Sequence, residues 1–389
     1  MEETPERESV VVEELPPPED AQPRGGPLLR LLRLQLLRIG ATVAVPIVAF
    51  IVLWLTFDFL RDAEANRVLV VLVAIVVGVF GVFALYFGMD SLTNLLPEGL
   101  REGVRPFVFV GPALVILSVY LVYPAINTTL LSFKDARGNA FVGLDNFTDI
   151  FTDSATLISI RNSVIWVIVV PLVAVAVGLG FATLVDKLGR RAEAISKSLI
   201  FMPMAISMVG ASIVWRFVYS FRPEGFGEQI GLLNGIWQGL GAAPVSWLQQ
   251  EPWNNLMLMV VLVWLQTGFA MVILSAAIKS VPDDILEAAR IDGANEIQVF
   301  WRVVFPMISS SIVVVGTTIV ITTWKVFDIV WVMTGGRNGT GVVAQQMVTE
   351  FFTNKNDGKG AALAVILLVA VIPIMIVNVK RFRAQEEQR

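Results

Sequence analysis

Residues Lys279 to Ile308 read KSVPDDILEAARIDGANEIQVFWRVVFPMI and lie between two long apolar stretches of the chain. Pro282 suits the first turn of a helix, because the N–H that proline lacks would have no partner there. Asp283 and Asp284 follow it, at the positive end of the helix dipole. The start of the segment therefore predicts a short helix rather than a span.

The rest of the segment predicts where that helix ends. Gly293 suits a helix C-terminus, where a left-handed backbone is favoured. A second short helix is predicted from about Asn295, ending before Pro306 because the residue before a proline disfavours the helical conformation. Two short helices joined at a glycine are thus predicted outside the bilayer.

Apolar blocks recur along the whole chain. The 389 residues are 55% hydrophobic and 16% charged, and the mean hydropathy is +0.71. The blocks are about 20 residues long, the length that a helix needs to cross about 30 Å of hydrocarbon. We predict an all-α polytopic membrane helix bundle with eight transmembrane helices, over residues 39–60, 68–89, 107–133, 162–185, 198–221, 254–278, 307–333 and 361–379.

The composition excludes several kinds of chemistry. With no cysteine and no histidine, the chain has no disulfide, thiolate metal site, cysteine nucleophile or histidine dyad. We predict no catalytic residue and no metal site. No G-x-x-x-x-G-K-[ST] stretch is present, so no P-loop is predicted. The net charge of −4 gives no basic field for nucleic acid.

Lysine and arginine counts predict the orientation. The segments before residue 39 and over 97–105, 186–197, 279–302 and 380–389 hold 18 of the 29 basic residues, against 9 in the segments of the other side. Since cytoplasmic loops are enriched in lysine and arginine, both termini and the 279–302 loop are predicted to be cytoplasmic.

The segments outside the spans differ in character. Residues 1–26 are acidic and proline-rich, which predicts a disordered cytoplasmic tail. Residues 27–38 alternate leucines with arginines, which predicts a basic interfacial segment. The outward segments 134–161, 222–253 and 334–360 are predicted to be partly ordered. They offer a surface to an extracytoplasmic partner, or pack against one another.

The 279–306 loop has features of a docking element. Ala288 and Ala289 are small enough for close backbone approach, and Glu287 and Arg290 can form charge-assisted hydrogen bonds with a partner. From the residues alone, a plain amphipathic connector remains an alternative.

The pattern of this loop resembles a known motif. Glu287-Ala288-Ala289-x3-Gly293, then nine residues and Val303-x-Phe305-Pro306, resembles the EAA loop of permeases of ATP-binding-cassette importers. Valine and phenylalanine stand here where the family has isoleucine and leucine. The resemblance implies that Glu287, Ala288, Ala289, Arg290, Asp292, Gly293 and Pro306 couple the chain to an ATPase.

Other segments resemble sugar permeases of the same family. They are Tyr123–Ile126, Leu131–Phe133, Phe141–Phe147 and Phe327–Gly336, together with Gly339–Val342 and Gly358–Ala364, which are most similar to α-glucoside permeases. The resemblance covers about 107–385 and implies a six-helix permease core there, with two extra N-terminal helices in 39–106 as in the maltose-permease subgroup.

The resemblance also implies partners. ATP and its Mg²⁺ would bind to a dimer of ATPase subunits, with no cofactor on this chain. A second permease subunit would complete the path through the cell inner membrane, and an extracytoplasmic sugar-binding protein would deliver the sugar.

Two groups of residues are candidates for the substrate path. Sugars are held by aromatic faces and polar side chains, and both types occur in the spans beside the loop. The candidates are Trp264, Gln266, Thr267 and Phe269 in the sixth span and Thr323, Trp324 and Asp328 in the seventh, with Thr322 beside them. Packing or hydrogen bonding between helices is the alternative role for each.

Lys325 and Asp328 are the unusual charges of the seventh span. Their i, i+3 spacing predicts a membrane ion pair on one helical face, which would lower the cost of placing charges there. A structural or gating pair, direct sugar contact and ion coupling are the three roles considered.

Two other function classes compete with an importer permease. An ion-coupled secondary transporter using Lys325 and Asp328 would need no docking loop, and internal repeats should relate its halves; none is evident. A membrane enzyme would lack histidine, cysteine and clustered carboxylates.

Overall fold

The computed structural model describes residues 47–61, 67–94, 96–223 and 225–386, together with residues 40 and 44. The predicted tail over 1–38 and part of the first predicted span lie outside these residues. The described chain is helical, with one isolated β-bridge between Lys134 and Phe141 and no strand. It divides into two compact units, residues 1–122 and 123–389.

The first unit consists of apolar helices. Residues 47–61 are helical, α2 spans Arg67–Thr93, and α3 spans Glu98–Leu117 and continues into a π-helical turn over Ser118–Val122. Tyr86 of α2 stacks on Phe109 of α3, with ring centroids 6.1 Å apart. Apolar side chains of α2 are exposed around the helix, as is typical of a helix that contacts lipid.

The second unit holds the remaining helices. They are α4 (Tyr123–Leu131), α5 (Asp145–Thr152), α6 (Ser154–Val185), α7 (Arg190–Phe201), α8 (Met208–Val218), α9 (Leu232–Gly239), α10 (Trp253–Lys279), α11 (Asp283–Ile291), α12 (Glu296–Val299), α13 (Phe305–Met307), α14 (Ser309–Trp324), α15 (Asp328–Met333), α16 (Val343–Val348) and α17 (Asp357–Glu386). A 3₁₀ turn spans Met202–Ala205, and π-helical turns span Phe300–Val304 and Thr349–Thr353.

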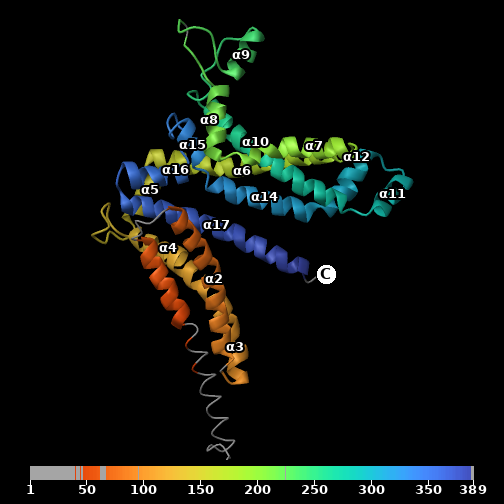
Figure 1. Ribbon diagram of the computed structural model, residues 1–389. Helices are drawn as coiled ribbons and strands as arrows, with labels where there is room; N and C mark the ends of the chain where they lie inside the picture. Colours follow the sequence, from red (N-terminus) through yellow and green to blue (C-terminus); the bar gives the residue numbers. More distant parts are fainter. Residues whose placement is uncertain are drawn as a thin grey trace, which may run out of the picture. The chain divides into compact units, whose positions relative to one another are not determined.

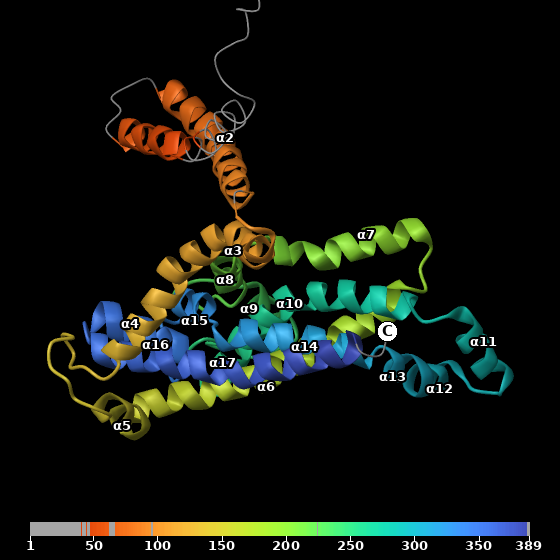
Figure 2. The ribbon, with the colours of Figure 1, turned by 90° about the horizontal axis from the view of Figure 1, so that it is seen from below.

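Helix α10 forms the centre of the second unit. It packs against α6, α7 and α14, and α6, α10 and α14 run side by side (Figures 1 and 2). Glycines permit the closest crossings. A Cβ added at Gly178 would lie 2.6 Å from the Cβ of Ala270, and one added at Gly268 would lie 2.5 Å from the carbonyl oxygen of Ile200. Small residues let backbones approach where lipid supplies no hydrophobic driving force.

The all-helical bundle is confirmed, and the described residues contain five to seven candidate spans. Five helices are long and apolar enough to cross a membrane by themselves, and two bent pairs raise the number to seven. The five are Arg67–Thr93, Glu98–Leu131, Ser154–Val185, Trp253–Lys279 and Asp357–Ile376. They correspond to the second, third, fourth, sixth and eighth predicted spans.

The fifth predicted span, 198–221, is wrong as one continuous helix. The chain bends by 100° between Ala205 and Met208. Pro203 lies in the 3₁₀ turn, and the Ser207 side chain caps α8 by accepting a hydrogen bond from the N–H of Gly210. The helix is therefore fully broken here, and α8 points away from the layer that contains α7 and α10 (Figure 1).

The seventh predicted span, 307–333, is also wrong as one helix. It bends by 68° before α14, and α14 ends at Trp324 before α15 begins at Asp328. Segments 134–161, 222–253 and 334–360, which are predicted to face outward, contain the short helices α5, α9 and α16, in agreement with the prediction of partial order.

The 279–306 loop and the glycine-rich loop 334–341 occupy opposite ends of the second unit. Figure 2 shows α11 and α12 at one end of the layer and α5, α15 and α16 at the other. The 279–306 loop and the glycine-rich loop that follows α15 are therefore separated by the length of the bundle.

Candidate functional site

The first docking helix, α11, is closed at both ends by local sequence. Pro282 is its N-cap residue, and Asp283 and Asp284 occupy the first turn. At its end Gly293 adopts φ +84°. The N–H of Gly293 donates to the carbonyl of Arg290 at 3.0 Å. The next N–H, of Ala294, reaches back to the carbonyl of Ala289 at 3.1 Å, completing a Schellman motif.

The second docking helix, α12, begins with a capping box. The Asn295 side chain accepts from the N–H of Gln298, whose side chain accepts from the N–H of Asn295. Arg290 Nε lies 2.9 Å from Glu296 Oε1, joining α11 to α12 across the glycine. The Glu296 carboxylate also raises the pKa of Arg290. These contacts fix the angle between the two helices.

The prediction that the second helix ends before Pro306 is wrong. A π-helical turn over Phe300–Val304 carries the chain into α13, where Pro306 lies in the first turn. Its missing N–H has no cost at that position, so the element continues into the base of α14.

The element rests on the core by one face and exposes the other. Val281 and Val299 are buried, and Leu286, Ala289 and Ala294 pack against the same core. The other residues implied in coupling are exposed: Glu287, Ala288, Arg290, Asp292, Gly293 and Pro306. Two isoleucines are also exposed, Ile291 by 85% and Ile297 by 71%. Exposed apolar side chains on a rigid, charged element are typical of a protein-binding surface.

Salt bridges brace the helix ends beneath this element. Lys279 Nζ, at the end of α10, lies 2.6 Å from Glu193 Oε1 of α7 and 3.4 Å from Asp186 Oδ1. Lys197 lies 2.5 Å from the same Glu193 oxygen. The network joins the ends of α6, α7 and α10.

The α10 candidates for the substrate path include an amide without a partner. Trp264 and Phe269 are half-buried, and Gln266 is 8% exposed. Among the described residues, the Gln266 side chain has no hydrogen bond. The Trp264 ring meets Trp215 of α8 edge-on, with centroids 5.6 Å apart. A buried amide usually has a hydrogen-bond partner, so Gln266 is available to a ligand.

The other path candidates use their donors within the fold. The Thr267 hydroxyl donates to the Val263 carbonyl and the buried Thr323 hydroxyl to the Ile319 carbonyl, both at 2.7 Å. Trp324 Nε1 donates to the Leu367 carbonyl of α17 at 3.0 Å. Helices α10 and α14 pack together, but within the described chain no hydrogen bond joins their candidates.

The predicted same-face pairing of Lys325 and Asp328 is wrong in this conformation. Lys325 caps α14 and Asp328 begins α15, so no continuous helix carries both. Lys325 is exposed and Asp328 half-buried, and over residues 225–386 no ion pair joins them.

Sequence reasoning missed the asparagines that hold the glycine-rich loop 334–341. Asn162 Nδ2 of α6 donates to the carbonyl oxygens of Gly339 and Gly341, at 2.6 and 2.8 Å. Asn254 and Asn255 of α10 donate to the carbonyls of Asn338 and Gly339. Asparagine inside an apolar helix was the available signal, because a buried amide needs partners.

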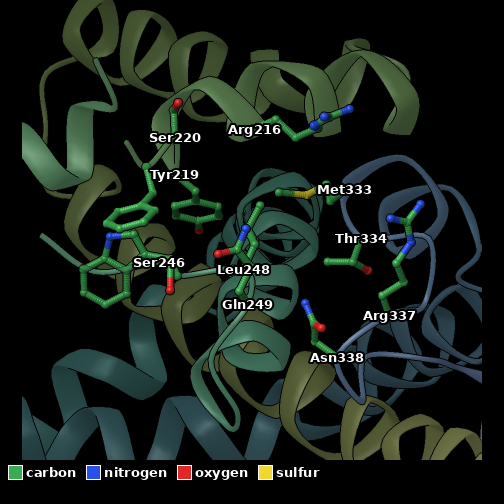
Figure 3. A pocket seen from close by; sticks show the side chains of 12 residues that line it. Arg216, Tyr219, Ser220, Ser246, Leu248, Gln249, Met333, Thr334, Arg337 and Asn338 are labelled. Carbon is green, nitrogen blue, oxygen red and sulfur yellow. The ribbon is translucent and has the colours of Figure 1, made fainter. Parts of the chain in front are cut away.

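This loop forms one wall of a polar pocket. The pocket has a volume of about 320 Å³ and lies between the end of α8, residues 246–249 and loop 334–341. Arg216 and Arg337 stand on different walls of it, and Gln249, Thr334 and Asn338 also line it (Figure 3). No sequence-predicted site residue lines it.

Comparison with known proteins gives close relatives along most of the chain. It is 54% identical to the osmoprotective compounds uptake permease protein GgtC of Synechocystis sp. over 282 residues, 72% of this chain and 100% of that protein. It is 46% identical to the alpha-glucoside transport system permease protein AglF of Rhizobium meliloti, covering 76% of this chain and 86% of that protein.

A solved structure shares the fold. A bacterial ABC transporter involved in the import of the acidic polysaccharide alginate superposes with a TM-score of 0.63 at 18% identity, over 74% of this chain and 99% of that one.

The family match completes the assignment. Residues 174–380 match the family described as the binding-protein-dependent transport system inner membrane component. This range includes the 279–306 loop, α10, α14 and the C-terminal part of α6. In such an importer the ATPase is a separate subunit, and the permease chain has no cofactor of its own. The chain therefore belongs to the family of binding-protein-dependent transport system inner membrane components, as a permease subunit of an ABC importer.

Proposed function

We propose that this permease forms part of the translocation path for a sugar or sugar-derived osmolyte of the α-glucoside class. The names of GgtC and AglF, which match the chain at 54% and 46% identity, support this substrate class. The observation that carries the path itself is the buried Gln266 amide, which lacks a partner in the described chain. It lies two residues after Trp264 and three before Phe269 on α10.

In the proposed path, α10 supplies the sugar contacts. Gln266 donates to and accepts from hydroxyls, and Trp264 and Phe269 supply ring faces. Thr267 and Thr323 can still accept a hydrogen bond, because each donates only its single hydroxyl hydrogen within the fold. Trp324 and Asp328 frame the path from α14 and α15.

The 279–306 loop couples this path to ATP hydrolysis. Its two helices form a rigid body, because the Schellman motif, the capping box and the Arg290–Glu296 pair fix their geometry. An ATPase subunit that closes on ATP would push the exposed face of α11, and the Lys279 network would carry the motion into α6, α7 and α10.

The chain has eight spans, and the importer to which it belongs has four kinds of subunit. The six-span core lies in 107–385, and 39–106 adds two further spans. Both termini are cytoplasmic, as the lysine and arginine distribution predicts. A second permease chain, a dimer of ATPase subunits and an extracytoplasmic sugar-binding protein complete the importer.

Two glycines with the same backbone conformation test the coupling role. Gly293 and Gly225 have φ +84° and +87° and open space around them, one in the docking loop and one in an outward segment. Gly293→Asp should abolish co-purification of the ATPase subunit and α-glucoside uptake, because aspartate strains the left-handed turn between α11 and α12. Gly225→Asp should retain the ATPase. Equal retention of the ATPase by both variants would refute the coupling role.

A further inference from the structure

The polar pocket between α8 and loop 334–341 carries positive charge without a counter-charge. Arg216 Nη1 donates to the Val332 carbonyl at 3.3 Å, and Arg337 is exposed. Over the described residues, neither guanidinium has a carboxylate within 4.0 Å. The guanidinium groups lie toward the same side of the pocket (Figure 3). Two unpaired guanidinium groups beside one cavity favour an anionic group in it.

The wall that presents Arg337 is rigid. Asn162, Asn254 and Asn255 hold the loop backbone from two helices. A Cβ at Gly336 would clash with the Gln345 side chain, and one at Gly339 with the carboxylate of Glu251. Glu251 itself lines a separate cavity of about 530 Å³. The loop is therefore fixed in place before any ligand arrives, which lowers the entropic cost of binding.

Three further polar side chains of the pocket make no hydrogen bond within the described chain. Among residues 96–223 and 225–386, the side chains of Ser246, Gln249 and Asn338 make no hydrogen bond, yet all three line the pocket. Hydroxyl and amide groups of this kind match the hydroxyls of a sugar. The lining thus combines a site for an anion with sites for hydroxyl groups.

Aromatic rings connect this pocket to the proposed path. Tyr219 lines the pocket and lies 5.2 Å from Trp215, centroid to centroid. Trp215 meets Trp264, a residue of the proposed path, at 5.6 Å. The pocket and the path are therefore neighbours through three rings on α8 and α10.

We propose that this pocket is an outer binding site for an α-glucoside that bears a carboxylate. Arg216 and Arg337 bind the carboxylate through charge-assisted hydrogen bonds, and Ser246, Gln249 and Asn338 bind sugar hydroxyls. The proposal rests on the proposed function, and it adds that anionic members of the substrate class are taken up as well as neutral ones.

A matched pair of sugars tests the site. The transporter is purified with its second permease and ATPase subunits but without the binding protein. Calorimetry then measures its affinity for maltose and for maltobionate, the same disaccharide oxidised at its reducing end to a carboxylate. We expect maltobionate to bind about tenfold more tightly, since hydrogen bonds between charged groups are the stronger ones, and this preference to shrink in high salt.

Arginine variants test whether the preference for maltobionate comes from this pocket. Arg216→Gln and Arg337→Gln should each lose about tenfold in maltobionate affinity with maltose unchanged, and Arg216→Lys should lose less. Arg137→Gln, an exposed arginine of another outward segment, should behave as the wild type. Because all three arginines are exposed, the variants should keep the unfolding temperature of the complex.

Two results would overturn the proposal. One is equal affinity for both sugars in the wild type. The other is a loss of ATPase stimulation by the binding protein in the arginine variants, without any change in their maltobionate affinity. The two arginines would then bind a carboxylate of the binding protein and not one of the sugar. Both results leave uptake of neutral α-glucosides by the wild type intact, whereas failure of the proposed function means that the wild type takes up no α-glucoside.

Discussion

The side-chain amide of Asn162 donates to the carbonyl oxygen of Gly339 at 2.6 Å, joining α6 to a loop 177 residues later in the chain. The same nitrogen donates to the Gly341 carbonyl. Asn162 is 2% exposed, so water cannot replace it as a donor. This residue organises the end of the bundle at which the polar pocket lies.

Replacing Asn162 by alanine should destabilise the chain. Two carbonyl oxygens would lose a buried donor, and an unsatisfied buried group costs about 1–3 kcal/mol. The expected result is a lower unfolding temperature of the purified complex in detergent. Asn139→Ala serves as control, because that residue is exposed on a turn. Similar unfolding temperatures for both variants would show that the two Asn162 hydrogen bonds do not stabilise the fold.

Gly268→Ala and Gly180→Ala should shift stability in opposite directions. At Gly268 the new Cβ would lie 2.5 Å from the Ile200 carbonyl oxygen and 2.7 Å from Phe201 Cα, and backbone atoms cannot move aside. Overpacking of this kind costs about 1–3 kcal/mol. At Gly180 no atom lies within 4 Å, so alanine should stabilise α6 by about 0.5–1 kcal/mol. The check is the unfolding temperature of each variant; a shift in the same direction would contradict the tight crossing of α7 and α10.

Gln266→Leu should separate stability from transport. Leucine removes a buried amide that has no partner in the described chain, so the unfolding temperature should stay the same or rise. Sugar-stimulated ATPase activity should fall by about tenfold or more, since a site built for hydroxyls loses its hydrogen bonds. Thr323→Val is the comparison, and its effect on ATPase activity should be smaller. If Gln266→Leu transported normally, Gln266 would not line the path.

The ionised carboxylate of Asp153 should make the stability of the folded chain depend on pH. The Thr156 hydroxyl, donating to the Asp153 side chain that caps α6, holds the pKa of this carboxyl below its ordinary value of 3.8. A lowered native pKa means that the stabilisation is fully present above about pH 4 and is lost as the pH falls through the native value.

Asp153→Asn tests this effect, because asparagine can still cap a helix but carries no charge. Its unfolding temperature should lie below that of the wild type at pH 7, and the gap should narrow as the pH falls below about 4. A gap that stays constant across this range would show that the charge of Asp153 contributes nothing. Lys359, whose Nζ lies 3.5 Å from Asp153, keeps Asp149 as a partner at 2.7 Å in the variant.

The docking element could be predicted from sequence because its signals are local. Pro282, the two aspartates and Gly293 act within one helix, so no distant contact was needed to place α11. The course past Pro306 could not be predicted, because the π-helical turn that accommodates it is set by how Val299 and Val304 are buried in the core.

The two broken spans could not be predicted for a different reason. Hydropathy reports length and apolar character, and both remain high through the turns at 206–207 and 325–327. The break at Ser207 depends on its cap to Gly210, and the break at Lys325 separates the charges that spacing alone would pair. The polar pocket could not be predicted either, because its lining residues come from three segments, the end of α8, 246–249 and 334–338, that come together only in the folded chain.

The central claim is that α11 is a cytoplasmic docking element. The chain has no cysteine, so single cysteines report without background. Ile291 is 85% exposed on α11, and Phe226 is 75% exposed in segment 222–253, which the lysine and arginine distribution predicts to face outward. A membrane-impermeant maleimide added to intact cells should label Phe226→Cys and leave Ile291→Cys unlabelled until the cells are permeabilised. Labelling of Ile291→Cys in intact cells would contradict the account.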